Sequence, residues 1–192
     1  MGIKVVSIIG DEPVTLEEIK LHCRIDHDDE DEYLLALIQT ARQYCETFTG
    51  RAIPLQVVEY TLDRWPPRKV LYLPKPPVTE VLGFEYRLKD DLIYTNFVDF
   101  ESDLDNEPAR VTPDDAWPSG SLHPVNGVKV EYMAGYHDVP EYVKSAVKLY
   151  AGSLYENREG VLPAGHIGRT LPMGIEALLW QERVFWIEAM NK

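Results

Sequence analysis

The sequence predicts a mixed α+β fold: a helical body that carries an inserted small antiparallel β module and a tethered C-terminal helix. Three observations predict it. Apolar residues recur every three or four positions in residues 13–50 and 139–160, which indicates helices. In residues 51–135 apolar and polar residues alternate, which indicates half-buried strands. Residues 161–174 are rich in glycine and proline, as in a flexible tether, and precede a last apolar segment over residues 175–190.

Three helices are expected in the body. The first begins at Thr15-Leu16-Glu17-Glu18, a capping box in which Thr15 and Glu18 satisfy backbone N–H groups that the helix leaves unpaired. The second follows the acidic run of residues 26–32 and ends before Gly50, which suits a left-handed C-cap. The third follows Pro140, since proline is tolerated in a first helical turn.

The β module is predicted from alternation and from its prolines. Strands are expected around residues 58–62, 82–88 and 128–132, and two more over residues 70–73 and 92–100. Ten of the 14 prolines lie between residues 51 and 135, where they mark connections because proline cannot donate to a strand ladder.

The last segment is apolar on most of its helical circumference. A helix of this kind must be buried on more than one side, and its own domain covers one. We therefore expect another chain to cover the other side, as in helix-in-groove recognition. The alternative is a terminal helix packed wholly on its own core. The predicted docking residues are Ile175, Leu178, Leu179, Trp180, Val184, Phe185, Trp186 and Ile187.

Composition and charge exclude several classes of protein. The 192 residues carry a net charge of −13, so the chain is not built to grip nucleic acid through its phosphates. No apolar run is long enough to cross a bilayer, and the first ten residues lack the layout of a signal peptide. The two cysteines, Cys23 and Cys45, lie on apolar helix faces and are expected to pack as small hydrophobes in a reducing cytoplasm.

The acidic run is the one hint of metal chemistry. Asp26, Asp28, Asp29 and Glu30 offer carboxylates that could bind a divalent ion in a metal-dependent phosphoesterase. The run lacks the glycine and distal glutamate of a calcium loop, and acids at a helix start favour the positive end of its dipole. No nucleophile elbow, phosphate loop, dinucleotide fingerprint or zinc spacing is present. A solvated helix start is the favoured interpretation, and no catalytic residue, cofactor or bound metal is expected.

The order of these segments resembles the gp6-like head–tail connector (adaptor) proteins of tailed bacteriophages, which also occur in prophages and gene transfer agents. The likeness extends over about residues 13–180, and the order and spacing of the segments carry it. They are Val14 to Lys20, Arg24 to Asp31, Cys45 to Arg51, Leu73 to Val78, Val130 to Tyr136, Val139 to Glu141, Leu154 to Glu159 and Ile175 to Leu179.

The resemblance implies a structural part of a virion and no enzymatic activity. Connectors of this family form a ring of about twelve subunits under the portal at the capsid vertex. The ring extends the channel through which DNA is packaged and ejected, and it docks the next neck or tail protein. The implied partners are other copies of the chain, the portal and that downstream protein. DNA would pass the lumen without sequence-specific binding, and no membrane is involved.

Two further expectations follow. The implied location is the virion neck, after synthesis in the bacterial host cytoplasm. Another neck component, such as a stopper or tail-completion protein, or a packaging accessory, remains an alternative, because these are also interaction modules that assemble into rings.

Overall fold

A computed structural model describes residues 1–158 and 173–184 of the chain. Within these ranges the chain divides into two compact units. A β unit contains residues 1–10, 50–137 and 184, and a helical unit contains residues 11–49 and 138–183. The fold is α+β, as predicted.

The helical unit contains α1 (Leu16–Cys23), α2 (Asp31–Thr49), α3 (Glu141–Glu156) and α4 (Met173–Trp180). Helices α1, α2 and α3 pack against one another, and α4 packs on α3 and α2. The apolar stripe predicted for the second helix is the buried face of α2, where Leu34, Ile38 and Ala41 are inaccessible to solvent.

The predicted helix ends are confirmed. Thr15 accepts a hydrogen bond from the Glu18 backbone N–H, and the Glu18 carboxylate accepts one from the Thr15 backbone N–H. Helix α1 ends at Arg24, which adopts the left-handed conformation with φ 59°. Gly50 follows α2 with φ 74°, a conformation that costs glycine little because it has no Cβ.

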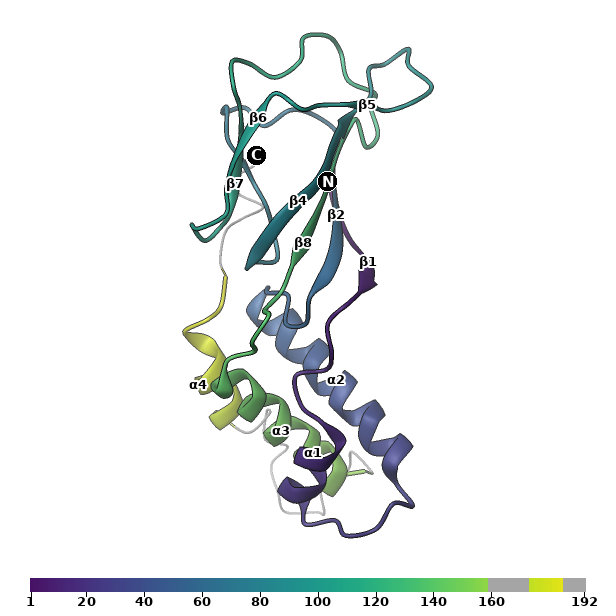
Figure 1. The fold of residues 1–192 in the computed structure, drawn as a ribbon, viewed down its shortest axis with the longest axis vertical. Coiled ribbons are helices and arrows are strands. Elements are labelled where there is room, and N and C mark those ends of the chain that lie inside the picture. The colour runs from purple at the N-terminus through teal and green to yellow at the C-terminus, as the bar shows by residue number, and fades with distance from the viewer. Residues whose placement is uncertain (159–172, 185–192) are drawn as a thin grey trace, which may run out of the picture. The chain divides into compact units, whose positions relative to one another are not determined.

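The β unit contains two antiparallel sheets (Figure 1). One has five strands in the order β1-β2-β8-β4-β5, and the other has three in the order β3-β7-β6. The bounds are β1 (Gly2–Ile8), β2 (Gln56–Leu62), β3 (Leu71–Tyr72), β4 (Val78–Tyr86), β5 (Thr95–Asn96), β6 (Phe100–Asp103), β7 (Arg110–Pro113) and β8 (Val128–Ala134).

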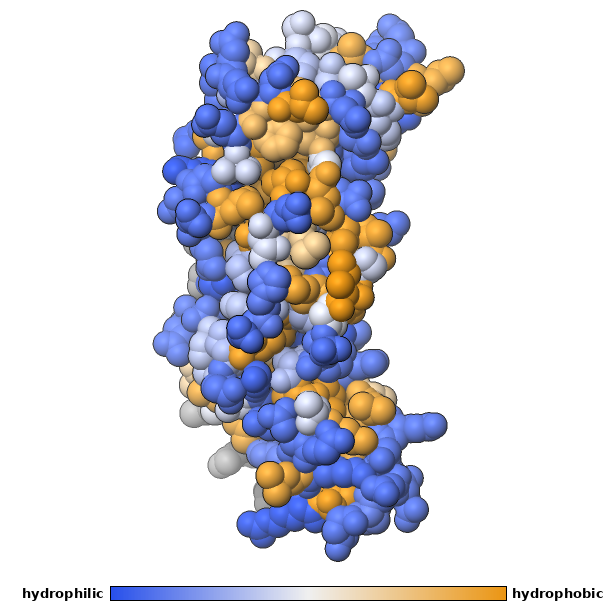
Figure 2. All heavy atoms as spheres, viewed as in Figure 1, coloured by the Kyte–Doolittle hydropathy of each residue, from blue (hydrophilic) through white to orange (hydrophobic). Residues whose placement is uncertain are grey.

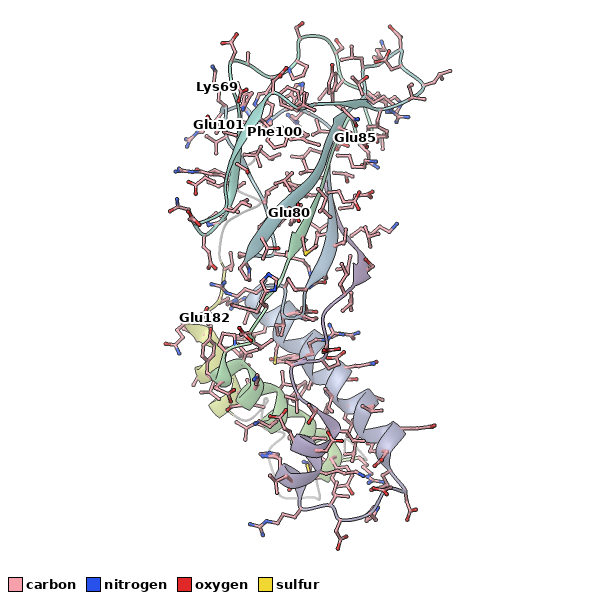
Figure 3. All side chains as sticks on the ribbon, viewed as in Figure 1. Lys69, Glu80, Glu85, Phe100, Glu101 and Glu182 are labelled. Atoms are coloured by element: carbon pink, nitrogen blue, oxygen red, sulfur yellow. The ribbon has the colours of Figure 1, made fainter. Side chains whose placement is uncertain are left out.

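The core of the β unit lies between the two sheets. Val58, Val130 and Tyr132 of the larger sheet and Leu71 and Val111 of the smaller sheet are fully buried in one cluster. We call the face of the larger sheet that points into this core its inner face. Phe100 of β6 packs against the core, whereas the next residue, Glu101, is exposed (Figure 3).

Several expectations about the β module need correction. The strand β1 was not expected, and it pairs with β2, so the β unit also includes chain that precedes α1. Strand β7 was not expected either. Of residues 92–100, expected to form one strand, only β5 and Phe100 are in strands, because the stretch bends between the two sheets.

The C-terminal helix also differs from its predicted range. Helix α4 begins at Met173, inside the stretch predicted as a tether, and ends at Trp180, before the predicted end at residue 190. Glu182 and Arg183 donate backbone hydrogen bonds to Leu179 and Trp180, the tight i to i−3 pattern with which helices often end. Residues 161–172 of the predicted tether, and residues 185–190 of the predicted helix, lie outside the described residues.

Candidate functional site

The predicted docking residues on α4 divide into two groups. Ile175 and Leu179 are fully buried, because α4 lies on α3 and α2 and turns these two side chains toward them. These two residues therefore belong to the chain's own helical core. Leu178 is half-buried, and Trp180 is 57% exposed.

Trp180 lies in a cluster of aromatic rings and a cation at the end of α4. Its ring centroid is 6.3 Å from that of Phe48 on α2. The Arg183 guanidinium lies 5.4 Å from the Trp180 ring and 5.1 Å from the Phe48 ring, within the range of cation–π attraction. The cluster presents a partly exposed indole on the helical unit, the kind of side chain that dominates many protein interfaces.

The remaining predicted docking residues lie beyond α4. Val184 is half-buried. Phe185, Trp186 and Ile187 lie outside the described residues, so their role stays a prediction.

The acidic run is held by basic and phenolic side chains. Lys20 on α1 forms an ion pair with Asp28, with 2.6 Å between nitrogen and oxygen, and another with Asp31. Glu30 accepts hydrogen bonds from the Tyr155 hydroxyl at 2.5 Å and from Arg158 at 2.6 Å. The run therefore ties the start of α2 to α1 and to the end of α3.

These contacts bear on the metal hypothesis. The hydrogen bonds from Tyr155 and then Arg158 lower the pKa of Glu30, and the hydrogen bond from Lys20 lowers the pKa of Asp28. In residues 1–158 and 173–184, no group of three His, Cys, Asp or Glu side chains is placed to hold a metal ion. Asp26, Asp28, Asp29 and Glu30 thus do not converge on one point.

Other polar and nucleophilic groups in the helical unit serve its packing. Buried Arg42 bonds to Glu12 at 2.9 Å and to Glu46 at 2.8 Å, which supplies the partners that a buried charge needs. Burial raises the pKa of the Cys45 thiol to about 12, so it remains protonated and unreactive at neutral pH. Among the described helices, none combines the length and apolarity needed to cross a bilayer.

The structure also contains an exposed apolar surface that the sequence interpretation missed. All seven residues of β1 are exposed, among them Ile3, Val5, Val6 and Ile8. On the face seen in Figure 2, apolar residues lie over the region where Figure 1 places this strand. The alternation of Ile3 and Val5 with Lys4 is the signal that could have revealed the strand.

Comparison with known proteins defines the class of fold. Residues 13–76 match the family model of the phage gp6-like head-tail connector protein. The resemblance inferred from the order of the sequence segments is therefore confirmed. No curated protein matches the sequence.

Solved structures of a phage-like particle share the fold over almost the whole chain. A chain in the neck of an empty gene transfer agent particle, computed with C6 symmetry, has a TM-score of 0.78, 21% identity and 95% coverage of both chains. A chain in the virion of the native particle has a TM-score of 0.77 and 21% identity. A chain in the native neck, computed with C12 symmetry, has a TM-score of 0.73 and 20% identity. Both matches cover 95% of this chain and 95% of the other.

Proposed function

We propose that this chain is a structural head–tail connector in the neck of a tailed phage or a phage-like particle. The observation that carries the proposal is the likeness to a neck chain over 95% of both chains at a TM-score of 0.78. The match of residues 13–76 to the connector family supports it independently, because it depends on sequence.

The chain acts as one subunit of a closed ring of about twelve copies. The C6 and C12 symmetries of the similar necks support a cyclic assembly. In a closed ring, one surface of each subunit binds a different surface of the next subunit, so every copy carries both complementary surfaces. The ring lies under the portal, extends the DNA channel and docks the next neck or tail protein.

The acidic charge suits this role. A net charge of −13 repels the phosphates of passing DNA, so the duplex slides without adhering to the wall. Glu30 and Asp28 are engaged in contacts that stabilise the helical unit, and this supports a structural role for the acidic run. The protein performs no chemical turnover in this account.

The C-terminal segment is the portal-docking element. Ile175 and Leu179 fix α4 to its own unit, and Trp180 is the aromatic anchor that α4 offers to a partner. Val184, Phe185, Trp186 and Ile187 are the further docking residues in the proposal. A partly exposed tryptophan can contribute 2 kcal/mol or more when a partner buries it, which is roughly a thirtyfold change in affinity.

Binding to capsids that carry a portal but lack the connector tests the proposal. The wild-type chain should co-sediment with these capsids, and Trp180→Ala should bind at least tenfold more weakly. Leu21→Ala is the matched control, because Leu21 is 82% exposed on α1 of the same unit and lies outside the docking surface. It should bind like the wild type.

Two results would overturn parts of the proposal. If the wild-type chain does not bind portal-bearing capsids, the connector role is wrong. If the Trp180→Ala variant binds as tightly as the wild type, Trp180 is not the docking anchor, although the connector role stands.

A further inference from the structure

The strand β1 leaves its apolar side uncovered. Among the described residues, its only partner in the sheet is β2, so its other edge is free for a further strand. Ile3, Val5 and Ile8 are 40%, 37% and 47% exposed. An apolar edge strand of this kind is a template for pairing with another chain, and native proteins normally cover or blunt such an edge.

The exposed side chains continue the core of the β unit. Residues paired across neighbouring strands lie on the same face of a sheet. Three rows on the inner face are Ile3-Tyr60-Val130-Phe84, Val5-Val58-Tyr132-Val81 and Ile8-Gln56-Ala134-Val78. The members of these rows on β2 and β8 are buried, whereas those on β1 are not. The inner face of the larger sheet is therefore buried on β2 and β8 but exposed to solvent on β1.

In the described residues, the opposite edge of the sheet is open along part of β4. Strand β5 pairs with β4 only at Glu85 and Tyr86. In the described part of the chain, the stretch Val78–Gly83 of β4 has β8 on one side and no strand on the other. Leu82 in this stretch is 45% exposed. Figure 3 shows Glu80 and Glu85 along β4.

The directions of the strands make these two edges compatible. The pairs β1–β2, β2–β8 and β8–β4 are all antiparallel, so β4 runs opposite to β1. Rotation about a ring axis keeps each strand's direction relative to that axis. The β4 edge of one copy thus meets the β1 edge of the next copy as an antiparallel pair, the arrangement already used throughout the sheet.

We propose that β1 of each subunit pairs with β4 of its neighbour, so that the ring is closed by a continuous antiparallel sheet. This inference rests on the proposed ring and names its subunit contact. Pairing of β1 with β1 of another copy would instead give a two-fold dimer and leave both β4 edges open. A head-to-tail contact gives both the β1 edge and the β4 edge of every subunit a strand to pair with.

The charges on the two edges agree with this contact. Lys4 and Glu80 both lie on the outer face of the larger sheet, the face opposite its inner face. Lys4 is in one row with Glu59 and Glu131, and Glu80 is paired with Met133, two residues from Glu131 on β8. Lys4 is exposed on one edge and Glu80 on the other. Apposing the edges brings opposite charges together on one face, which favours the correct pairing.

Disulfide trapping tests the contact. In a chain with Cys23→Ala and Cys45→Ala, Val81→Cys is combined in turn with Ile3→Cys, Val5→Cys and Ile8→Cys, which share its face and sample three registers. Within one subunit, β1 and β4 are three strand spacings apart, about 14 Å, and a disulfide requires Cα atoms within about 7 Å. A disulfide between these cysteines must therefore join two subunits.

The expected result is a ladder of covalent oligomers from at least one double-cysteine chain after oxidation of the assembled ring. Each single-cysteine chain should stay monomeric on a denaturing gel. Covalent dimers from Val5→Cys alone would overturn the proposal in favour of β1–β1 pairing. Assembled rings that yield no disulfide in any of the three combinations would also overturn it.

A charge exchange provides a second measurement that does not depend on the geometry of a disulfide. Lys4→Glu and Glu80→Lys should each reduce the fraction of chain in rings, and the double variant should restore it. Unchanged assembly in both single variants would contradict the proposed contact. Binding of these preparations to portal-bearing capsids separates the two proposals, because wild-type chain that binds capsids while these tests fail keeps the connector role and loses only this contact.

Discussion

Glu30 shows how single residues in the acidic run stabilise the helical unit. Its carboxylate accepts hydrogen bonds from Tyr155 and Arg158, and the Arg158 guanidinium lies 4.9 Å from the ring of Tyr33 and 4.7 Å from that of Tyr155. The sequence predicted that the run begins a helix. It could not predict these partners, because they are more than 120 residues away and local patterns carry no information about such contacts.

Glu30→Gln should lower the melting temperature of the helical unit at neutral pH. Because the folded-state pKa of Glu30 lies below its usual value of 4.5, the ionised carboxylate stabilises the fold above that pH, and the contribution is lost as the pH falls through the folded-state pKa. Melting followed by circular dichroism should thus show a difference from wild type at pH 7 that shrinks toward pH 3. A difference that stays constant with pH would contradict this role.

At the scale of elements, local signals were sufficient where an element is stabilised by its own residues. The capping box at Thr15, the stripe of α2 and the glycine after it all appear in the structure as predicted. Elements defined by their partners were predicted less well. Strand β1 is paired with β2, and the short strands β5 and β7 exist because of the strands beside them.

Thr15→Ala should destabilise the helical unit by about 1 kcal/mol, because it removes the acceptor for the Glu18 N–H at the start of α1. Thr40→Ala is the matched control, since the Thr40 hydroxyl bonds only to the Ala36 carbonyl of its own helix. That change should alter stability by less than about 0.5 kcal/mol. Urea unfolding followed by circular dichroism measures both. Equal effects of the two substitutions would show that the capping box contributes nothing specific.

Helix α4 also shows the difference between what an element's own residues predict and what its partners decide. The sequence predicted an apolar helix that is covered on more than one side, and the structure assigns one of these sides to the chain itself through Ile175 and Leu179. An apolar pattern that extends around most of the helix could not predict which side of a terminal helix packs on its own chain. The burial of these two residues leaves Trp180 as the residue on α4 that tests docking most cleanly.

At the scale of the whole molecule, charge and open edges suit an assembly rather than an isolated subunit. In the proposed ring, a net charge of −13 repels the phosphates of passing DNA. In the described residues, β1 and the Val78–Gly83 stretch of β4 each lack a strand on one side, and the proposed ring uses these two edges. The segment order in the sequence predicted the family resemblance, whereas the subunit contact required the sheet topology.

Electron cryomicroscopy of portal-bearing capsids incubated with the purified chain tests the central claim most directly. The reconstruction of the portal vertex, calculated without imposed symmetry, should contain a closed ring of this chain in contact with the portal and coaxial with it. Capsids whose portal vertex carries no density for the chain, or chain bound as single copies elsewhere on the shell, would contradict the proposed role as a neck connector.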